Sequence, residues 1–367
     1  MNWYEISNID TIATPALLVF PERIKLNIQR MLEISGDVNR LRPHTKTHKT
    51  AEVIKLQQEV GINKFKCATI AEAELLAKCG AKEILLAMQP VAENINRFFK
   101  LKETYPNSYF STLVDNDLIL EQINKLAGEK SMKVGLWMDV NVGMNRTGIV
   151  PDEKAFKLFK SLIASENIIA EGFHVYDGHL RNPNFNQRKK DCDTAFEKVL
   201  LLKAKLEKES FNVKHIIAGG SPSFPVHALR DDVDLSPGTT LLWDAGYGDL
   251  FPEMKMLHAA VLVTRIISKP SEGILCLDLG HKSLASEMPF PRVKFLKPND
   301  FEQISQSEEH FVVKTKTPEK YNIGDVFYAV PMHICPTVAK YQELKVVKNN
   351  AVVGTWDVVA RNQKITI

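Results

Sequence analysis

The sequence lacks the features that define several broad classes of protein. Its five cysteines are odd in number, widely spaced and without a CxxC pair, so no disulfide is expected and a reducing cytoplasm suits the chain. The net charge of +3 gives no indication of a nucleic-acid partner. No apolar run approaches the length of a membrane span, and the opening residues MNWYEISNIDTIATP have no apolar core of an export signal.

Common functional motifs are also missing. The chain contains no P-loop, GxGxxG, HExxH or GxSxG, and it shows no solenoid repeat. Its 18 glycines and 18 prolines are scattered, so no low-complexity linker stands out. With 44% hydrophobic and 25% charged residues over 367 positions, it has the composition of a globular protein long enough for two domains.

The first two thirds of the chain alternate short β-rich runs with amphipathic helical runs. After an apolar run at 15–20 and a helix near 21–34, the pattern predicts eight strands, at 39–46, 64–69, 83–88, 109–115, 133–141, 168–177, 213–219 and 233–238. Eight strands with intervening helices predict an α/β fold with a (β/α)8 TIM-type barrel, although an open doubly wound sheet also fits.

The pattern of predicted secondary structure changes at about residue 245. Runs such as VLVTRIISK, ILCLDLG and DVFYAV are separated by proline, glycine and polar turns, which indicates an antiparallel β domain. We therefore expect a barrel at 15–243 and a β domain at 244–367, the latter together with residues 1–14.

The octapeptide RPHTKTHK at 42–49 carries the first chemical signal. If it is extended, Arg42, His44, Lys46 and His48 face the same way. Nearby positive charge and partial desolvation would then lower the pKa of Lys46. A neutral amine can form a Schiff base with an aldehyde such as pyridoxal 5'-phosphate. The alternative is a basic loop that is solvated or contacts phosphate.

The predicted barrel brings further residues to the same end as Lys46. Strand seven ends in Gly219, Gly220 and Ser221, and strand eight leads to Gly238 and Thr239. These are the two loops that most often form a phosphate site in this fold, through accessible N–H groups and hydroxyls. An aldehyde with a phosphate tail therefore accounts for the lysine and for both loops.

These motifs, with GMNRTG at 143–148 and HICP at 333–336, resemble the fold-type III pyridoxal-phosphate enzymes, whose barrel is that of the alanine racemase N-terminal domain. Within them the chain is most similar to the D-threonine aldolase and D-serine dehydratase branch, over nearly its whole length. The resemblance implies that Lys46 carries the cofactor, with His44, Arg146 and Tyr176 as further cofactor-binding residues. It also implies a homodimer with the active site at the subunit interface. For Arg146, the residues alone leave open a structural ion pair with Asp139.

His333 and Cys335 bear on the reaction. An imidazole and a thiolate one residue apart can bind one cation and favour Zn²⁺, although such a pair is also found by chance in protein cores. In the resembled family a late HxC or HxD pair holds a catalytic metal. Zinc is therefore expected here, with Mn²⁺ or Mg²⁺ as alternatives.

The resemblance implies a lyase that acts on a D-β-hydroxy-α-amino acid. The products would be pyruvate and ammonia from D-serine, or glycine and acetaldehyde from D-threonine. Cys335 departs from the aspartate of the aldolase pattern and favours dehydration. An amino-acid racemase is the alternative, because GYGD at 246–249 is similar to a racemase segment that bears a tyrosine base. It lies, however, just after Gly238, before the β domain is under way.

Overall fold

The computed structural model describes residues 1–298 and 300–367, which fall into two compact units. The barrel unit contains Leu32–Lys46, Ile54–Gly238 and Asn362–Ile367. The antiparallel unit contains Met1–Met31, Thr47–Val53 and Thr239–Arg361. The sequence pattern predicts a barrel at 15–243 and a β domain at 244–367 with 1–14. In the structure, residues 15–31, 47–53 and 239–243 group with the antiparallel unit, and residues 362–367 group with the barrel unit.

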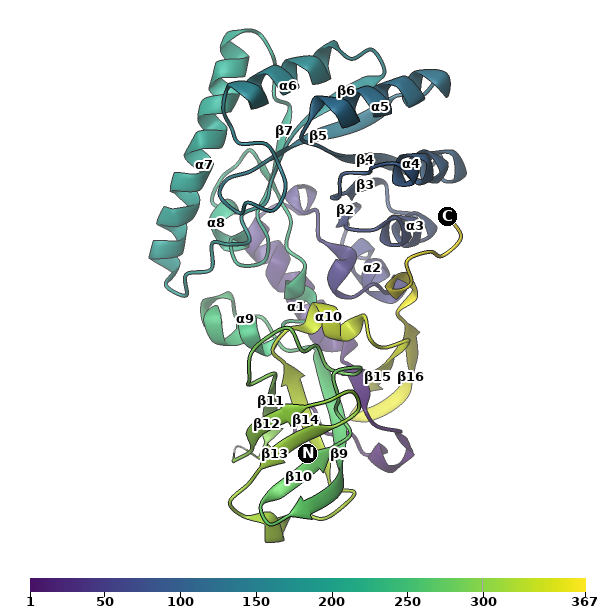
Figure 1. Cartoon of the computed structure of the whole chain (residues 1–367), viewed down its shortest axis with the longest axis vertical. Helices are drawn as coiled ribbons and strands as arrows, with labels where there is room; N and C mark the ends of the chain where they lie inside the picture. The colour runs from purple at the N-terminus through teal and green to yellow at the C-terminus, as the bar shows by residue number, and fades with distance from the viewer. Residues whose placement is uncertain (299) are drawn as a thin grey trace. The chain divides into compact units, whose positions relative to one another are not determined.

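Seven parallel strands form the sheet of the barrel unit, in the order β2-β3-β4-β5-β6-β7-β8 (Figure 1). Their neighbours in the sheet are their neighbours in sequence, as the predicted alternation of strands and helices requires. The strands are β2 Lys64–Cys67, β3 Glu83–Leu86, β4 Tyr109–Val114, β5 Val134–Val140, β6 Ile168–Val175, β7 His215–Ala218 and β8 Val233–Leu235. Each lies within a strand predicted from the sequence.

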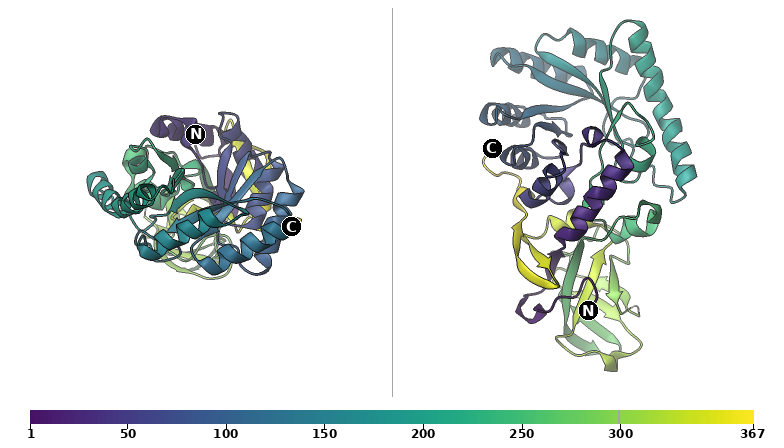
Figure 2. Two further views of the ribbon diagram at one scale, coloured as in Figure 1. Left: turned by 90° about the horizontal axis from the view of Figure 1, so that it is seen from above. Right: turned by 180° about the vertical axis from the view of Figure 1, so that it is seen from behind.

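Amphipathic helices connect these strands and lie outside them (Figure 2). Several begin at a side chain that caps a backbone N–H, as Thr69, Asn116, Asp152 and Asn184 do. The helices are α2 Ala51–Gln58, α3 Ile70–Lys78, α4 Glu93–Thr104, α5 Asp117–Glu129, α6 Glu153–Ala164, α7 Phe185–Lys208 and α8 Phe224–His227. On the inner side of the sheet, Leu85, Leu113, Trp137 and Ile217 form a buried cluster.

Segment 41–44 lies between the first and last of these strands. Leu41 forms a parallel bridge to Leu235 of β8, and His44 forms one to Lys66 of β2. The segment thus takes the place of the eighth strand and closes the barrel, which confirms the predicted fold class.

The expectation of an extended octapeptide is nevertheless wrong. The predicted strand 39–46 is reduced to these bridges, because 3₁₀ turns occupy Val38–Arg40 and Thr45–Thr47. Two local causes are that Pro43 has no N–H for a ladder and that the imidazole of His44 accepts the N–H of Lys46.

The antiparallel unit is built on a nine-stranded sheet. Its main path runs β12-β13-β10-β9-β1-β15-β16, with β14 paired to β9 and β11. The strands are β1 Ala16–Val19, β9 Ala260–Ser271, β10 Ile274–Leu277, β11 Val293–Lys297, β12 Glu302–Gln306, β13 Phe311–Lys314, β14 Val326–Pro331, β15 Glu343–Lys348 and β16 Ala351–Asp357. Strand β1 pairs antiparallel with β9 and parallel with β15, so the apolar run at 15–20 belongs to this sheet.

Three further α-helices lie in the described residues: α1 Pro21–Ser35, α9 Ala245–Leu250 and α10 Ile334–Val338. The short helix α10 directly follows His333 and contains Cys335. Among the described residues, no helix combines the length and the apolar character needed to cross a membrane.

Candidate active site

Lys46 lies in the turn that ends the barrel segment. Nδ1 of His44 accepts a hydrogen bond from the N–H of Lys46 at 3.2 Å, and the N–H of His44 donates to the carbonyl of Pro237 at 2.8 Å. His44 therefore shapes the turn that presents the lysine. The Lys46 amine lies 5.9 Å from the ring centroid of Tyr176, so the structure brings together two residues predicted from distant motifs.

The cations near Lys46 differ from those expected. Arg42 turns to the carboxylates of Glu83 and Asp234, at 3.0 and 3.5 Å, so acids already compensate its charge. His48 is buried in the antiparallel unit, where its Nδ1 accepts the N–H of Thr50. The predicted row of four side chains on one face is therefore wrong, because it depended on an extended backbone.

Arg146 is positioned by a tightly bonded loop after β5. The side-chain oxygen of Asn141 accepts the N–H groups of Gly143 and Asn145, at 3.0 and 3.1 Å. Gly143 has a φ of 117°, which glycine adopts without strain. The loop carries the Arg146 guanidinium to 4.6 Å from the ring centroid of Tyr176, where a fixed cation faces the same ring as Lys46.

Asp139 has other partners than Arg146. Its Oδ1 lies 2.7 Å from Nδ1 of His174, and its Oδ2 accepts a hydrogen bond from Gln89 at 2.9 Å. Burial opposes the charge of Asp139, but the bond with His174 and the bond from Gln89 hold its pKa below the usual value. Burial also lowers the pKa of His174. The pair therefore contains a carboxylate and a neutral imidazole.

Lys66 is a further cation beside the Tyr176 ring that was not predicted from the sequence. It lies on β2, is only 2% exposed, and places its amine 5.9 Å from the centroid of the Tyr176 ring. The one available signal was a lysine alternating with apolar residues in the strand KFKC. Among the described residues no carboxylate lies within 4 Å of the amines of Lys46 and Lys66 or of the Arg146 guanidinium, so this cluster suits an anionic ligand.

The two predicted phosphate loops lie side by side. The N–H of Gly238 donates to the hydroxyl of Ser221 at 3.2 Å, which joins the loop after β7 to the loop after β8. A Cβ added to Gly220 would lie 3.1 Å from the Tyr176 ring, so only glycine lets this loop approach the ring closely. The N–H groups of Gly219 and Gly220 donate within the protein, to Val175 and Ser223. The hydroxyl of Ser221 thus lies where the two loops meet.

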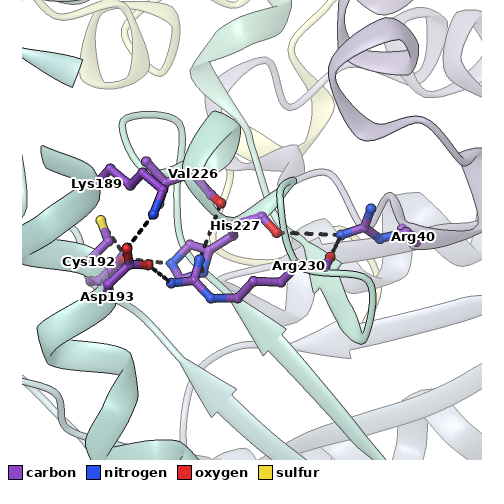
Figure 3. A network of polar contacts seen from close by, with 8 residues as sticks. Arg40, Lys189, Cys192, Asp193, Val226, His227 and Arg230 are labelled. Carbon is purple, nitrogen blue, oxygen red and sulfur yellow. Dashed lines mark hydrogen bonds and ion pairs between the residues drawn. The ribbon is translucent and has the colours of Figure 1, made fainter. Parts of the chain in front are cut away.

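A buried hydrogen-bonded network supports the loop after β7. Oδ1 of Asp177 accepts the hydroxyl of Ser223 at 2.6 Å, and Oδ2 lies 2.7 Å from Nε2 of His227. Arg230 donates to Nδ1 of His227 and also pairs with Asp193, as Figure 3 shows. Nε2 of His227 must therefore carry the proton that is donated to Asp177. The network fixes Ser223, whose hydroxyl in turn holds the N–H of Gly220.

Asp177, Cys192 and His227 also offer three ligand atoms within 4.8 Å of one another, as a metal site would. The 2.7 Å between His227 and Asp177 is a hydrogen-bond distance, whereas an oxygen and a nitrogen on one zinc ion lie about 3.3 Å apart at normal bond lengths. Burial and the Asp177 charge raise the pKa of Cys192 to about 12. This group is therefore best described as a hydrogen-bonded network.

The predicted metal pair lies at the start of α10. Burial alone would lower the pKa of His333, but Cys335, Asp244 and Glu287 raise it to about 9. Surroundings that favour a proton in this way also favour a metal cation. The sulfur of Cys335 lies 3.1 Å from the hydroxyl of Thr47 and 3.7 Å from that of Thr239, so Thr239 belongs to this cluster.

Two carboxylates that the sequence analysis missed position this pair. Nδ1 of His333 lies 2.6 Å from Glu287, which leaves Nε2 for a metal, and a carboxylate in this place typically orients a histidine ligand. Asp244 is buried, and its Oδ2 accepts the N–H of Ile334 while its Oδ1 accepts that of Tyr247. The turn between His333 and Cys335 is therefore anchored to the start of α9. The donor set fits a zinc ion with open positions.

The GYGD segment of the racemase alternative forms most of α9. The ring of Tyr247 packs at 5.8 Å from Trp243 and 5.5 Å from Phe251, and Gly246 lies against the carbonyl of Met332. This packing explains the residues of the segment without a catalytic role.

Comparisons with known proteins cover nearly the whole chain. Residues 20–243 match the family model of the alanine racemase N-terminal domain, and residues 259–347 match a model for a serine dehydratase domain. A 3-hydroxy-D-aspartate aldolase of Paracoccus denitrificans (strain Pd 1222) is 26% identical, over 96% of this chain and 93% of the relative. A D-serine dehydratase of Dictyostelium discoideum is 23% identical, over 94% of this chain and 95% of its own.

Among solved structures, the D-threonine aldolase from Filomicrobium marinum superposes with a TM-score of 0.85 at 24% identity, over 97% of both chains. At this identity the likeness shows the fold alone. The resemblance inferred from the motifs is confirmed by the family models and the curated relatives together.

Proposed function

Because the chain belongs to the alanine racemase N-terminal domain family, we propose that it is a pyridoxal-phosphate- and metal-dependent lyase of D-β-hydroxy-α-amino acids. The curated relatives named above are aldolases and dehydratases of such compounds. The observation that carries the proposal is the convergence of Lys46, Lys66 and Arg146 on the Tyr176 ring, beside the two joined loops after β7 and β8.

The barrel unit supplies the cofactor side of this proposal. Lys46 would hold the cofactor covalently, Arg146 and Tyr176 would face its ring, and Ser221 would contact its phosphate where the two loops meet. When bound, the cofactor supplies an electron sink for bonds at the substrate Cα. The amine of Lys46 is the proposed base at that carbon, because its turn presents it beside the Tyr176 ring.

The antiparallel unit supplies the metal side. His333 and Cys335 would hold the ion, with Glu287 fixing the tautomer of His333. A divalent cation supplies a Lewis acid for the β-oxygen of the substrate. The thiolate favours Zn²⁺ over Mn²⁺ or Mg²⁺, which prefer oxygen ligands. Between the two outcomes, the sulfur ligand supports dehydration of D-serine over cleavage of D-threonine.

Incubation of the purified protein with D-serine and, separately, D-threonine tests this assignment. We expect pyruvate and ammonia from D-serine as the larger activity, with glycine and acetaldehyde from D-threonine as the smaller one. Chiral analysis of the remaining substrate is the control for a racemase. Appearance of the L-enantiomer without keto acid or glycine would contradict the lyase and support the racemase.

We further propose a homodimer in the cytoplasm. All five cysteines are free thiols in the structure, as a reducing compartment permits. Sedimentation of the purified protein at twice the mass of the 41.4 kDa chain would support the dimer.

A further inference from the structure

Lys66 occupies a buried position where a lysine lowers the stability of the fold. It pairs with Leu85 across β2 and β3, and Leu85 belongs to the buried cluster inside the barrel. Side chains of paired residues in neighbouring strands point to the same face of the sheet. Lys66 therefore projects into the barrel interior, where branched apolar residues are the rule and a buried amine lowers stability.

The surroundings of the amine compensate this cost only in part, because burial and the charges of Lys46 and Arg146 lower the pKa of Lys66 while the charges of Asp139 and Asp177 raise it. The carboxylate of Asp139 is bonded to His174, and that of Asp177 is bonded to His227 and Ser223. The amine faces Lys46 in the turn after segment 41–44, Arg146 on the loop after β5, and the Tyr176 ring after β6. Burial first, and then the charge of Lys46, lower the pKa of Lys66 to about 7.

We propose that Lys66 is a cofactor-binding residue that takes up a proton when an anionic pyridine phosphate enters the pocket, and then serves beside Arg146 as a second cation for it. The inference rests on the proposed cofactor. The reason is linkage, because an anion that is better bound by the ammonium form must draw a proton onto the amine. The Lys66 amine would therefore be largely neutral without the ligand and charged when the pyridine phosphate is bound.

The test uses pyridoxine 5'-phosphate, which has no aldehyde and cannot react with Lys46. Calorimetric titration in buffers of different ionisation enthalpy measures the protons taken up on binding. With a pKa of about 7 in the empty pocket, Lys66 can take up to roughly 0.9 proton at pH 8 and roughly 0.1 at pH 6. The ionisation of the probe itself is removed by subtracting the values for Lys66→Met.

Lys66→Met should reduce the proton uptake at pH 8 to the part that comes from the probe itself, and should weaken binding of the probe by about ten- to a hundredfold. It should also raise the thermal midpoint of the empty protein, because methionine fills the same space without a buried amine. A lysine with a merely structural role would lower the midpoint and leave the probe affinity unchanged. Lys66→Arg, a permanent cation, should lose the uptake and keep most of the affinity.

Lys102→Met is the matched control. Burial also lowers the pKa of Lys102, but its amine lies on the carbonyl of Phe110, so its loss should leave probe binding unchanged. Equal affinity of wild type and Lys66→Met, or equal proton uptake at pH 8, would overturn the role of Lys66 while the cofactor assignment stands. If wild type binds neither this probe nor pyridoxal 5'-phosphate, both proposals fail.

Discussion

The two units assemble their candidate sites in opposite ways. In the barrel unit, Lys46, Lys66, Arg146 and Tyr176 come from four separate places in the sequence and meet at one tyrosine ring. In the antiparallel unit, the two proposed metal donors are one residue apart at the start of a five-residue helix. The first site depends on the closure of a sheet, and the second depends on one short segment.

This difference has energetic consequences. A pocket lined by many residues loses affinity by degrees when one contact is removed, except at the residue that bonds covalently to the ligand. A two-donor metal site loses its ion when either donor is removed, because no other contact replaces it. The following variants test whether the two units differ in this way.

The largest effect is expected at Lys46. Lys46→Ala should lower turnover by roughly 10³- to 10⁶-fold, as is usual when the residue that bonds to the reacting group is lost. The protein as isolated should be yellow, and borohydride reduction should leave the cofactor mass on the peptide that contains Lys46. Lys49→Ala is the matched control, since the Lys49 amine instead contacts the carbonyl of Ala360. Labelling of Lys49, together with an active Lys46→Ala variant, would contradict the assignment.

The next effect is expected at the metal pair. His333→Ala, or a chelator, should remove the bound metal and lower turnover by more than about 100-fold. The absorbance of the bound cofactor should not change, because the cofactor residues belong to the other unit. His310→Ala, an exposed histidine of the same unit, should have no effect. Full activity in excess chelator, with no divalent ion found by metal analysis, would refute the metal site.

Cys335→Asp sharpens the same test. A carboxylate is a harder ligand than a thiolate, so the variant should shift from Zn²⁺ towards Mn²⁺ or Mg²⁺. If the ligand type helps to choose the reaction, the ratio of glycine to pyruvate formation should rise. An unchanged ratio with a changed metal would show that the choice is made elsewhere.

The same contrast explains what the sequence could predict. Seven barrel strands were found from their periodicity, since short β-rich runs alternate there with amphipathic helical runs. The proposed metal pair could be named from the sequence because His333 and Cys335 are only one residue apart. The strands at 293–297 and 302–306 were missed, since VKFLK and EQISQ have few buried residues to form a pattern.

Contacts made only by the fold were not predictable in this way. Lys66 comes close to Lys46 only when β2 pairs with segment 41–44, and Glu287 reaches His333 from 46 residues away. Strand β1 was separated from its sheet because its partners lie more than 240 residues downstream. The octapeptide was predicted to be extended because a hydrogen bond between the backbone and a side chain produces no periodic pattern in the sequence. Here the N–H of Lys46 donates such a bond to the imidazole of His44.

A smaller effect is expected at the phosphate loops. A side chain at Gly220 would press on the Tyr176 ring, so Gly220→Val should weaken cofactor binding by about ten- to a hundredfold. Folding should be affected far less, since the loop lies at the end of its strand. Gly36→Ala is a control for a glycine with open space around it, although its φ of 70° adds backbone strain. Unchanged cofactor affinity in a folded Gly220→Val protein would count against the loop as a phosphate site.

The smallest effect concerns two buried histidines with different partners, His48 in the antiparallel unit and His174 in the barrel unit. Burial lowers the pKa of His48 to about 3, and its Nδ1 accepts the N–H of Thr50. Burial also lowers the pKa of His174, but Asp139 beside it opposes the shift. Below the unfolded pKa of about 6.5, the unfolded chain binds protons that the folded imidazoles do not. Stability is therefore full above that pH and falls as the pH drops below it.

For His48, the free energy of unfolding should fall by about 1.4 kcal/mol at pH 5.5. For His174 the decrease should be smaller, because its carboxylate partner can share the incoming proton. Asp139 does not reverse this order in the same window, since its lowered pKa contributes stability that is lost only at more acid pH. Urea unfolding of wild type, His48→Asn and His174→Asn at pH 7.5 and 5.5 measures both contributions. Asparagine can accept the N–H of Thr50 but cannot take up a proton. His48→Asn should therefore remove more of the pH dependence than His174→Asn, and an equal or reversed order would show that the carboxylate partner does not protect the barrel unit against acid.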